Sequence, residues 1–452
     1  MASAGRDSKY FAGYAEPEAR LAATLSGYYS AAIVVPLCRE SIEFLRGYEA
    51  ALAASSERVL MILVVNGAEH ASAETHGANR RLLDELARRF PERARLEAEN
   101  VRTTAELARA EHCDLLWLDR ASPGLLLPSG EGVGLARKIG ADLAAALWAC
   151  GQIACAQIGS SDADATLPSD YFARLAASAS MEACTALLWP FVHEPSGELA
   201  IDEATVRYEI SLRYYVLGLA AAKSPYAYQS IGSSLSFDAA AYVSVRGFPK
   251  RAAAEDFYLL DKLAKVGPLR RLGGAPIRLA ARASDRVPFG TGRGTSEIVG
   301  IRAGGAEFEL YAPESFGALA AVLEGLNAFA ESAELEALRD SIASKEPALA
   351  HEIGDALERL GVFAAFSQAA TQAKPGPSLK RRVHTWFDAL RTLRFLHLLR
   401  ARALPALVWR EALARASFLD APFADGPSAD AVRSRLANAE ALLPASVGPT
   451  LP

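Results

Sequence analysis

Short apolar runs alternate with helical patterns along the first part of the chain. Residues 31–35 and 59–65 are continuous apolar runs, which is the pattern of strands buried on both faces of a parallel sheet. Between them, apolar side chains recur at helical spacing from Ile42 to Leu52, and Asn66 with Gly67 ends the second run. The order strand, helix, strand predicts a βαβ unit near the start of the chain.

The alternation continues less regularly up to about residue 300, and helical patterns predominate from Pro313 onward. We predict helices over residues 80–90, 134–150 and 202–222, and strands over residues 115–118, 153–158 and 184–188. The chain then divides into an N-terminal extension over residues 1–30, an α/β domain over residues 31–305 and a mainly helical region over residues 306–452.

Composition narrows the class of protein. A chain of 452 residues suits two domains, or one domain with an extension. No apolar run approaches the roughly 20 residues of a membrane-spanning helix, so we expect no transmembrane segment. The formal net charge of −5 gives no general attraction to a polyanion, and we expect no nucleic-acid partner. Early charged residues and five cysteines without a CxxC pair favour a cytoplasmic protein with buried free thiols.

Two carboxylates one residue apart, Asp162 and Asp164, follow the predicted strand over residues 153–158. Open α/β sheets bind ligands at the carboxyl ends of their strands. A divalent cation held there by carboxylate oxygens can bridge phosphate oxygens and neutralise the charge that develops on a departing diphosphate. The position predicts a site for Mg²⁺ or Mn²⁺, although the same spacing is common on surface loops.

A second acidic pair, Glu255 and Asp256, opens a predicted helix and follows Gly247-Phe248. A carboxylate at this place can remove the proton from a hydroxyl group that attacks a substrate. Helix capping is the alternative, because acidic residues favour the first turn of a helix on electrostatic grounds alone.

These pieces occur in the order seen in family-2 glycosyltransferases, which the chain resembles over about residues 30 to 290. The resemblance is carried by Ile33–Pro36 with Arg39–Glu40, by Gly134–Gly140, by Asp162–Asp164, by Gly247–Phe248 and by Glu255–Asp256. It implies the GT-A fold, a Rossmann-like mixed sheet flanked by helices. It also implies metal-dependent transfer of a sugar from a UDP- or GDP-linked donor.

The resemblance assigns roles to particular residues. Asp256 would be the catalytic base with Glu255 beside it, and Arg137 or Lys138 would reach diphosphate oxygens. Family members more often have Asp where this chain has Asn66, which leaves the choice between uridine and guanosine open. The implied donor-binding residues are Pro36, Leu37, Arg39, Glu40, Asn66, Arg137, Lys138, Asp162 and Asp164.

Further side chains are candidates for the acceptor and the metal. Gly232 and Ser233 lie where family members line the acceptor pocket, and Arg282 and Arg286 lie on a later loop where they could clamp an anionic group. A plain turn and a solvated loop are the alternatives. His193 is a candidate third metal ligand beside Asp162 and Asp164, although a lone histidine is more often structural.

Several functions stay open. The predicted base favours single-sugar transfer with inversion, to a small-molecule, glycan or lipid-linked acceptor. A processive polysaccharide synthase is disfavoured because the chain lacks the Gln-x-x-Arg-Trp element. The alternatives are a retaining transferase resembling those that glycosylate glycerate or phosphoglycerate, and a silent nucleotide-sugar-binding or scaffold protein. The basic stretch over residues 380–400 suits an anionic membrane surface, the outer face of a packed helix or a homodimer contact.

Overall fold

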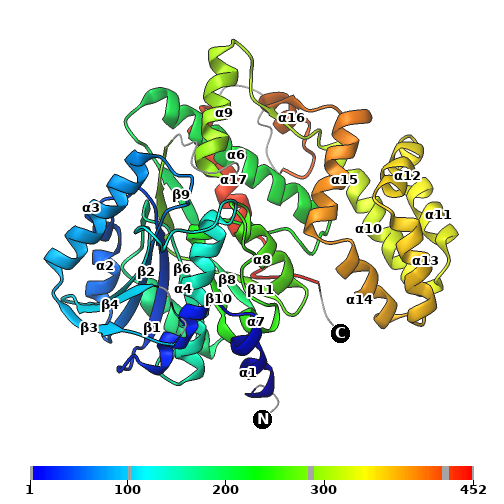
Figure 1. Ribbon diagram of the computed structural model, residues 1–452. Coiled ribbons are helices and arrows are strands. Elements are labelled where there is room, and N and C mark those ends of the chain that lie inside the picture. The colour runs from blue at the N-terminus through cyan, green and yellow to red at the C-terminus, as the bar shows by residue number, and fades with distance from the viewer. Residues whose placement is uncertain (1–3, 100, 102, 283–289, 420–426, 450–452) are drawn as a thin grey trace. The chain divides into compact units, whose positions relative to one another are not determined.

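The structure is a computed structural model that describes residues 4–99, 101, 103–282, 290–419 and 427–449 (Figure 1). The chain forms two compact units. One contains Met1–Gly197 with Ser230–Arg293, and the other contains Glu198–Gln229 with Gly294–Pro452. The α/β unit therefore differs from the predicted domain over residues 31–305, because it includes the first 30 residues and excludes residues 198–229.

The first unit is built on a large mixed β-sheet. Its strands are β1 (Ala31–Leu37), β2 (Val59–Asn66), β3 (Glu92–Leu96), β4 (Thr104–Arg109), β5 (Cys113–Arg120), β6 (Gln157–Ser160), β8 (Ala186–Leu188), β10 (Leu235–Asp238) and β11 (Leu269–Arg271). They follow the order β11-β8-β10-β6-β1-β2-β5-β4-β3. β1 pairs in parallel with both β6 and β2, whereas β10 is antiparallel to β6 and β8. The predicted α/β class with a mixed sheet is confirmed.

Helices cover both faces of this sheet. They are α2 (Arg46–Ala54), α3 (Ala73–Arg89), α4 (Gly132–Ala149), α5 (Tyr171–Ala177), α7 (Ala239–Ser244) and α8 (Glu255–Ala264), and α1 (Ala4–Gly13) packs on α7. A Cβ at Gly140 of α4 would lie 2.4 Å from Val34 Cγ1, and a Cβ at Gly159 of β6 would lie 2.6 Å from the Tyr171 hydroxyl and 3.1 Å from Ile33. Ile33 and Val34 alternate along β1, so α4 and α5 pack on opposite faces. Glycine at both positions permits this close approach.

A small second sheet is formed by three short strands from the part of the chain that follows β6. It consists of β7 (Ala165–Thr166), β12 (Ile277–Ala280) and β9 (Phe191–Glu194), with β12 in the middle. β12 is antiparallel to β7 and parallel to β9. The backbone N–H of Ala280 donates to the carbonyl of Asp164 at 3.0 Å. This pairing places the residues that follow β12 against the loop that carries the two aspartates.

Some strands lie where the sequence predicts them, and others are shifted along the chain. The predicted βαβ unit is present, but Pro36 lies inside β1 instead of ending it. The pairing of β1 with β6 stops at Val34, so the missing N–H of Pro36 removes no bond on that side. The strand predicted over residues 153–158 is wrong in position, because β6 spans Gln157–Ser160 and Ile153 makes only an isolated bridge.

The second unit is almost wholly helical, as predicted for the C-terminal region. Its elements are α6 (Leu199–Ala221), α9 (Thr291–Ala303), β13 (Glu309–Leu310), α10 (Glu314–Ser332), α11 (Leu335–Lys345), α12 (Ala350–Arg359), α13 (Val362–Gln372), α14 (Pro377–Trp386), α15 (Ala389–Arg402), β14 (Leu407–Val408), α16 (Trp409–Arg415), α17 (Ala429–Ala441) and β15 (Ser446–Val447). Its core follows α10, where Leu319, Leu326 and Phe329 are buried at helical spacing. α6 approaches α10 closely because Gly218 faces the ring of Phe316.

Two predictions about the chain as a whole can be compared with the structure. In the part of the chain that the structure describes, no helix is both long and apolar enough to cross a membrane. All five cysteines are free thiols, as predicted. Their predicted burial holds for Cys113 and Cys155 but is wrong for Cys150, which is exposed at the end of α4.

Candidate functional site

Three segments of the first unit bring charged side chains together at the carboxyl end of β6. The guanidinium of Arg137, on α4, donates from Nε to Glu255 Oε1 at 2.7 Å and from Nη2 to Asp162 Oδ1 at 2.6 Å. Its Nη1 donates to Ser160 Oγ at 3.0 Å and to the carbonyl of Ser161 at 3.1 Å. The two acidic motifs, which lie far apart in the sequence, therefore meet on one arginine.

This cluster is nearly closed to solvent. The side chains of Arg137 and Glu255 are 4% and 5% exposed, while that of Asp162 is 30% exposed. Burial by itself lowers the pKa of the Arg137 guanidinium, but the charges of Asp162 and Glu255 outweigh burial and raise that pKa. Arg137 therefore stays protonated and serves as the fixed cation between two carboxylates.

Asp256 lies beside the cluster in the first turn of α8. The preceding residue, Ala254, has a left-handed backbone with φ of 60°, which is uncommon for a residue other than glycine. Asp256 Oδ1 accepts a hydrogen bond from the backbone N–H of Phe257 at 2.7 Å. Burial, followed by the charge of Glu255, raises the pKa of Asp256 to about 7, against the opposing effect of Arg137. A carboxylate with this pKa can exchange a proton near neutral pH.

A second, more open cluster surrounds Asp164. Arg282 Nη2 lies 2.7 Å from Asp164 Oδ2, and Arg282 Nη1 lies 3.3 Å from Glu40 Oε1. The Arg282 side chain is 37% exposed, so solvent reaches this guanidinium far more than that of Arg137. Tyr48 donates its hydroxyl hydrogen to the Asp162 carbonyl at 2.6 Å, which fixes the loop between the two aspartates. Nothing in the sequence pattern pointed to Tyr48, which reads as one more apolar position of α2.

The loop after β1 and the end of β2 are joined through Asn79 of α3. Asn66 Nδ2 donates to the carbonyls of Leu37 and Val64 at 3.0 and 3.1 Å. Asn79 Nδ2 donates to the Asn66 carbonyl at 2.8 Å, and Asn79 Oδ1 accepts from the Arg39 backbone N–H at 2.8 Å. The structure thus places Asn66 against the predicted donor-binding loop. That loop also includes Pro36. Asn79 was not predicted as a site residue, because in the sequence it is only one polar position within a helical pattern.

Lys138 does not join this group. Its Nζ donates to Asp142 Oδ2 at 2.8 Å and to the Tyr10 hydroxyl at 3.0 Å, and the Tyr242 hydroxyl donates to Asp142 at 2.7 Å. Consecutive residues on a helix point about 100° apart, so Arg137 and Lys138 face different surroundings. The predicted contact of Lys138 with a donor diphosphate has no support in this arrangement, because its ammonium is held in a buried network with the N-terminal segment.

The acceptor candidates fall in different places. The carbonyl of Gly232 accepts from Ser160 Oγ at 3.0 Å, and a Cβ at Gly232 would lie 2.5 Å from Arg137 Nη2. Gly232 therefore makes room for Arg137, and Ser233 beside it is buried in a 3-10 turn. Arg282 pairs with Asp164 as described, whereas Arg286 lies outside the described residues.

The predicted metal ligands Asp162, Asp164 and His193 lie in the first unit. His193 is buried on β9 with its ring edge-on to Phe191. Within the described residues, no group of three or more His, Cys, Asp or Glu side chains that could hold a metal is found, and the role of His193 stays a prediction. Mg²⁺ often binds through only one or two carboxylates together with substrate phosphates. Asp164 fits that requirement, because its partner Arg282 is half-exposed.

No family model matches the chain. A search of curated proteins finds no match either.

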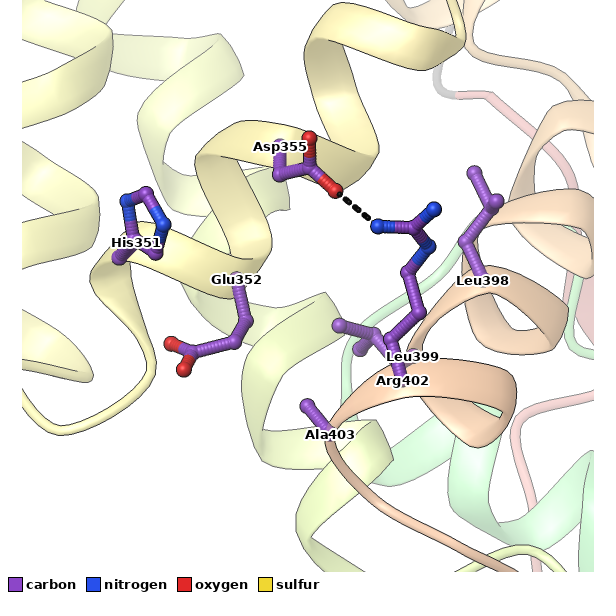
Figure 2. Close-up of a pocket in the computed structure, with 7 residues that line it drawn as sticks. All are labelled: His351, Glu352, Asp355, Leu398, Leu399, Arg402 and Ala403. Carbon is purple, nitrogen blue, oxygen red and sulfur yellow. Dashed lines mark hydrogen bonds and ion pairs between the residues drawn. The ribbon is translucent and has the colours of Figure 1, made fainter.

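The second unit contains a separate hollow of about 280 Å³, shown in Figure 2. Arg402 of α15 reaches toward Asp355 of α12 across it, at 3.0 Å, and Arg359 Nε donates to the same carboxylate at 2.9 Å. The hydrogen bond from Arg359 lowers the pKa of Asp355. Asp355 is thus paired with two cations, and Glu352 and His351 also line the hollow.

Proposed function

We propose that the first unit is a GT-A glycosyltransferase that depends on Mg²⁺ or Mn²⁺ and moves one sugar from a UDP- or GDP-linked donor to a hydroxyl acceptor. The observation that carries the proposal is the meeting of Asp162 with Glu255 on Arg137, next to Asp164 and Asp256. Ligands of open α/β sheets bind at the carboxyl ends of the strands, and these charged groups lie at such an end.

The two aspartates take different parts in donor binding. Asp164 would hold the divalent cation, because its partner Arg282 can turn toward solvent, while Asp162 stays with the buried Arg137. The cation, when bound with the donor, neutralises charge on the diphosphate as it departs. The loop held by Asn66 and Asn79 lies at the end of the neighbouring strands β1 and β2 and would border the nucleotide.

Asp256 acts as the base. It removes the proton of the acceptor hydroxyl while the acceptor oxygen bonds to the anomeric carbon. The bond from that carbon to the diphosphate oxygen breaks, and the nucleoside diphosphate leaves with the electron pair. A pKa raised to about 7 by burial and by Glu255 suits a group that must accept a proton near neutral pH. Direct displacement of this kind inverts the anomeric centre.

A binding or scaffold protein without turnover is the second candidate. The observation that favours it is the pairing of both aspartates with arginines, Asp162 with Arg137 and Asp164 with Arg282. Under that alternative, the pairs would be permanent and no cation would enter. A retaining transferase is distinguished from an inverting one by the anomeric configuration of its product.

The test compares wild-type protein with Asp256→Asn. Each is incubated with UDP- and GDP-sugars, Mn²⁺ and a panel of acceptors, and nucleoside diphosphate release is measured; donor binding is measured separately by calorimetry without acceptor. We expect release by the wild type alone, with donor binding retained in the variant. Equal release by both proteins would remove Asp256 as the base. Binding without release by the wild type, over a panel of acceptors, would favour the binding protein.

A further inference from the structure

We infer that Arg137 is a positioning residue, whose buried guanidinium ties the start of α8 to the end of β6 and so holds Asp256 in place relative to the aspartate loop. This inference rests on the proposed function, since the role of Asp256 as a base comes from it. It replaces the predicted contact between Arg137 and the donor diphosphate.

The donor capacity of Arg137 is taken up almost entirely by the protein. A guanidinium has five N–H groups, and four of those on Arg137 are directed to Glu255, Asp162, Ser160 and the Ser161 carbonyl. The side chain is 4% exposed. A phosphate-binding arginine needs donors that face the ligand, so Arg137 is placed to hold protein segments together.

Its surroundings are shaped around the guanidinium. A Cβ at Gly232 would come within 2.5 Å of Arg137 Nη2, so any larger residue there would displace the arginine. Ser160 receives a hydrogen bond from Arg137 Nη1 and donates its own to the Gly232 carbonyl. The end of β6, the turn at Gly232 and helix α4 are thereby joined through the side chain of Arg137.

The approach to α8 is also anchored on α4. The N–H of Gly134 donates to the Arg251 carbonyl at 3.0 Å, and a Cβ at Gly134 would lie 2.7 Å from the Pro249 carbonyl. The loop before α8 therefore lies directly on the first turn of α4. Arg137 stands one turn further along and holds Glu255, so α4 fixes α8 at two successive points and sets the place of Asp256.

Hydrogen exchange measures this restraint without any substrate. We expect Arg137→Gln to speed exchange of the amides in the first two turns of α8 by about tenfold, with β1 and β2 unchanged within about twofold, because local opening exposes only the freed segment. Arg137→Lys should give an intermediate effect, since one ammonium cannot replace a planar fork. Arg80→Gln is the control: Arg80 is exposed on α3, away from α8, so exchange in α8 should stay as in the wild type.

A rescue experiment separates positioning from simple filling of space. Arg137→Gln leaves Glu255 buried beside Asp162 without their shared cation, so adding Glu255→Gln should restore much of the protection in α8. Unchanged exchange in α8, an equal increase throughout the unit, or failure of the double variant to restore protection would each overturn the inference. Melting of the wild type with UDP or GDP and Mn²⁺ is measured in parallel. Its failure to shift would count against the proposed function and leave the exchange result to decide the role of Arg137.

Discussion

The two aspartates after β6 are two residues apart, yet their arginine partners differ in kind. Asp162 is bound to Arg137, which is 4% exposed and also holds Glu255. Asp164 is bound to Arg282, which is 37% exposed and otherwise contacts Glu40. A buried arginine with several acceptors is fixed, whereas an exposed ion pair contributes little and exchanges readily.

The difference indicates a division of labour within one motif. Asp162, 30% exposed, is tied to the buried arginine that also holds α8, whereas Asp164, 19% exposed, is tied to an arginine at the surface, and we propose that Asp164 is the carboxylate that exchanges its arginine for a cation. Spacing along the chain gives both aspartates the same apparent role, and only the burial of their partners separates them. Matched substitutions in the two ion pairs test whether the pairs differ in this way.

The largest expected difference is in stability. Arg137→Gln leaves two carboxylates without their cation in a buried place and should lower the free energy of unfolding by about 3–5 kcal/mol. Arg282→Gln removes an exposed pair and should lower it by less than about 1 kcal/mol. Urea unfolding of both variants measures the contrast. Similar losses in the two variants would abolish the distinction between a fixed and an exchangeable pair.

Gly232 provides a second way to disturb the fixed pair. In Gly232→Ala the added methyl group must displace the Arg137 guanidinium, and such overpacking typically lowers stability by about 1–3 kcal/mol. Gly273→Ala is the matched control, because no atom lies within 4 Å of its Cβ position, and it should stay within about 0.5 kcal/mol of the wild type. A tolerated Gly232→Ala would show that Arg137 has room to move.

The free energy of unfolding should depend on pH through Asp256. Its pKa is raised to about 7 in the folded protein, above its unfolded value, so protonated Asp256 favours the fold and this contribution is lost as the pH rises toward 7. The unfolding free energy of the wild type minus that of Asp256→Asn should therefore fall by about 1–3 kcal/mol between pH 5 and pH 8. Denaturant titrations across that range measure it. A difference that rises with pH would mean that the Arg137 charge outweighs burial at Asp256.

The smallest expected effect concerns cation binding at the exposed pair. An exposed ion pair is worth at most about 1 kcal/mol, so Arg282→Gln should raise the affinity for Mn²⁺ in the presence of UDP by up to about fivefold. Asp164→Asn should abolish that binding. Electron paramagnetic resonance of free Mn²⁺ during titration reports both, and tight binding to Asp164→Asn would assign the cation to another ligand.

Much of the α/β framework follows from the sequence because buried parallel strands are continuous apolar runs. β1 and β2 are of this kind and are predicted nearly residue by residue. β3 and β4 escape prediction, since β3 is an edge strand that carries Glu92, Arg93 and Arg95. Their strand character comes from pairing, of β3 with β4 and of β4 with β5, and not from any apolar pattern.

The carboxylates of the candidate site can be predicted from the sequence, but the arginines that pair with them cannot. Asp162, Asp164, Glu255 and Asp256 stand out because acidic pairs follow a strand or open a helix. The tie through Arg137 depends on contacts between residues more than 100 positions apart, which no local pattern encodes. For the same reason the sequence placed residues 198–229 in the α/β domain, although α6 packs with α10 and α17.

The most direct test of the proposed activity is the melting temperature of the purified protein with UDP- and GDP-sugars, each with and without Mn²⁺. Ligands that bind only the folded state raise the melting temperature. The account predicts a rise with one nucleotide class that requires Mn²⁺ and is absent in Asp164→Asn. No rise with any donor, in protein shown to be folded, would contradict it.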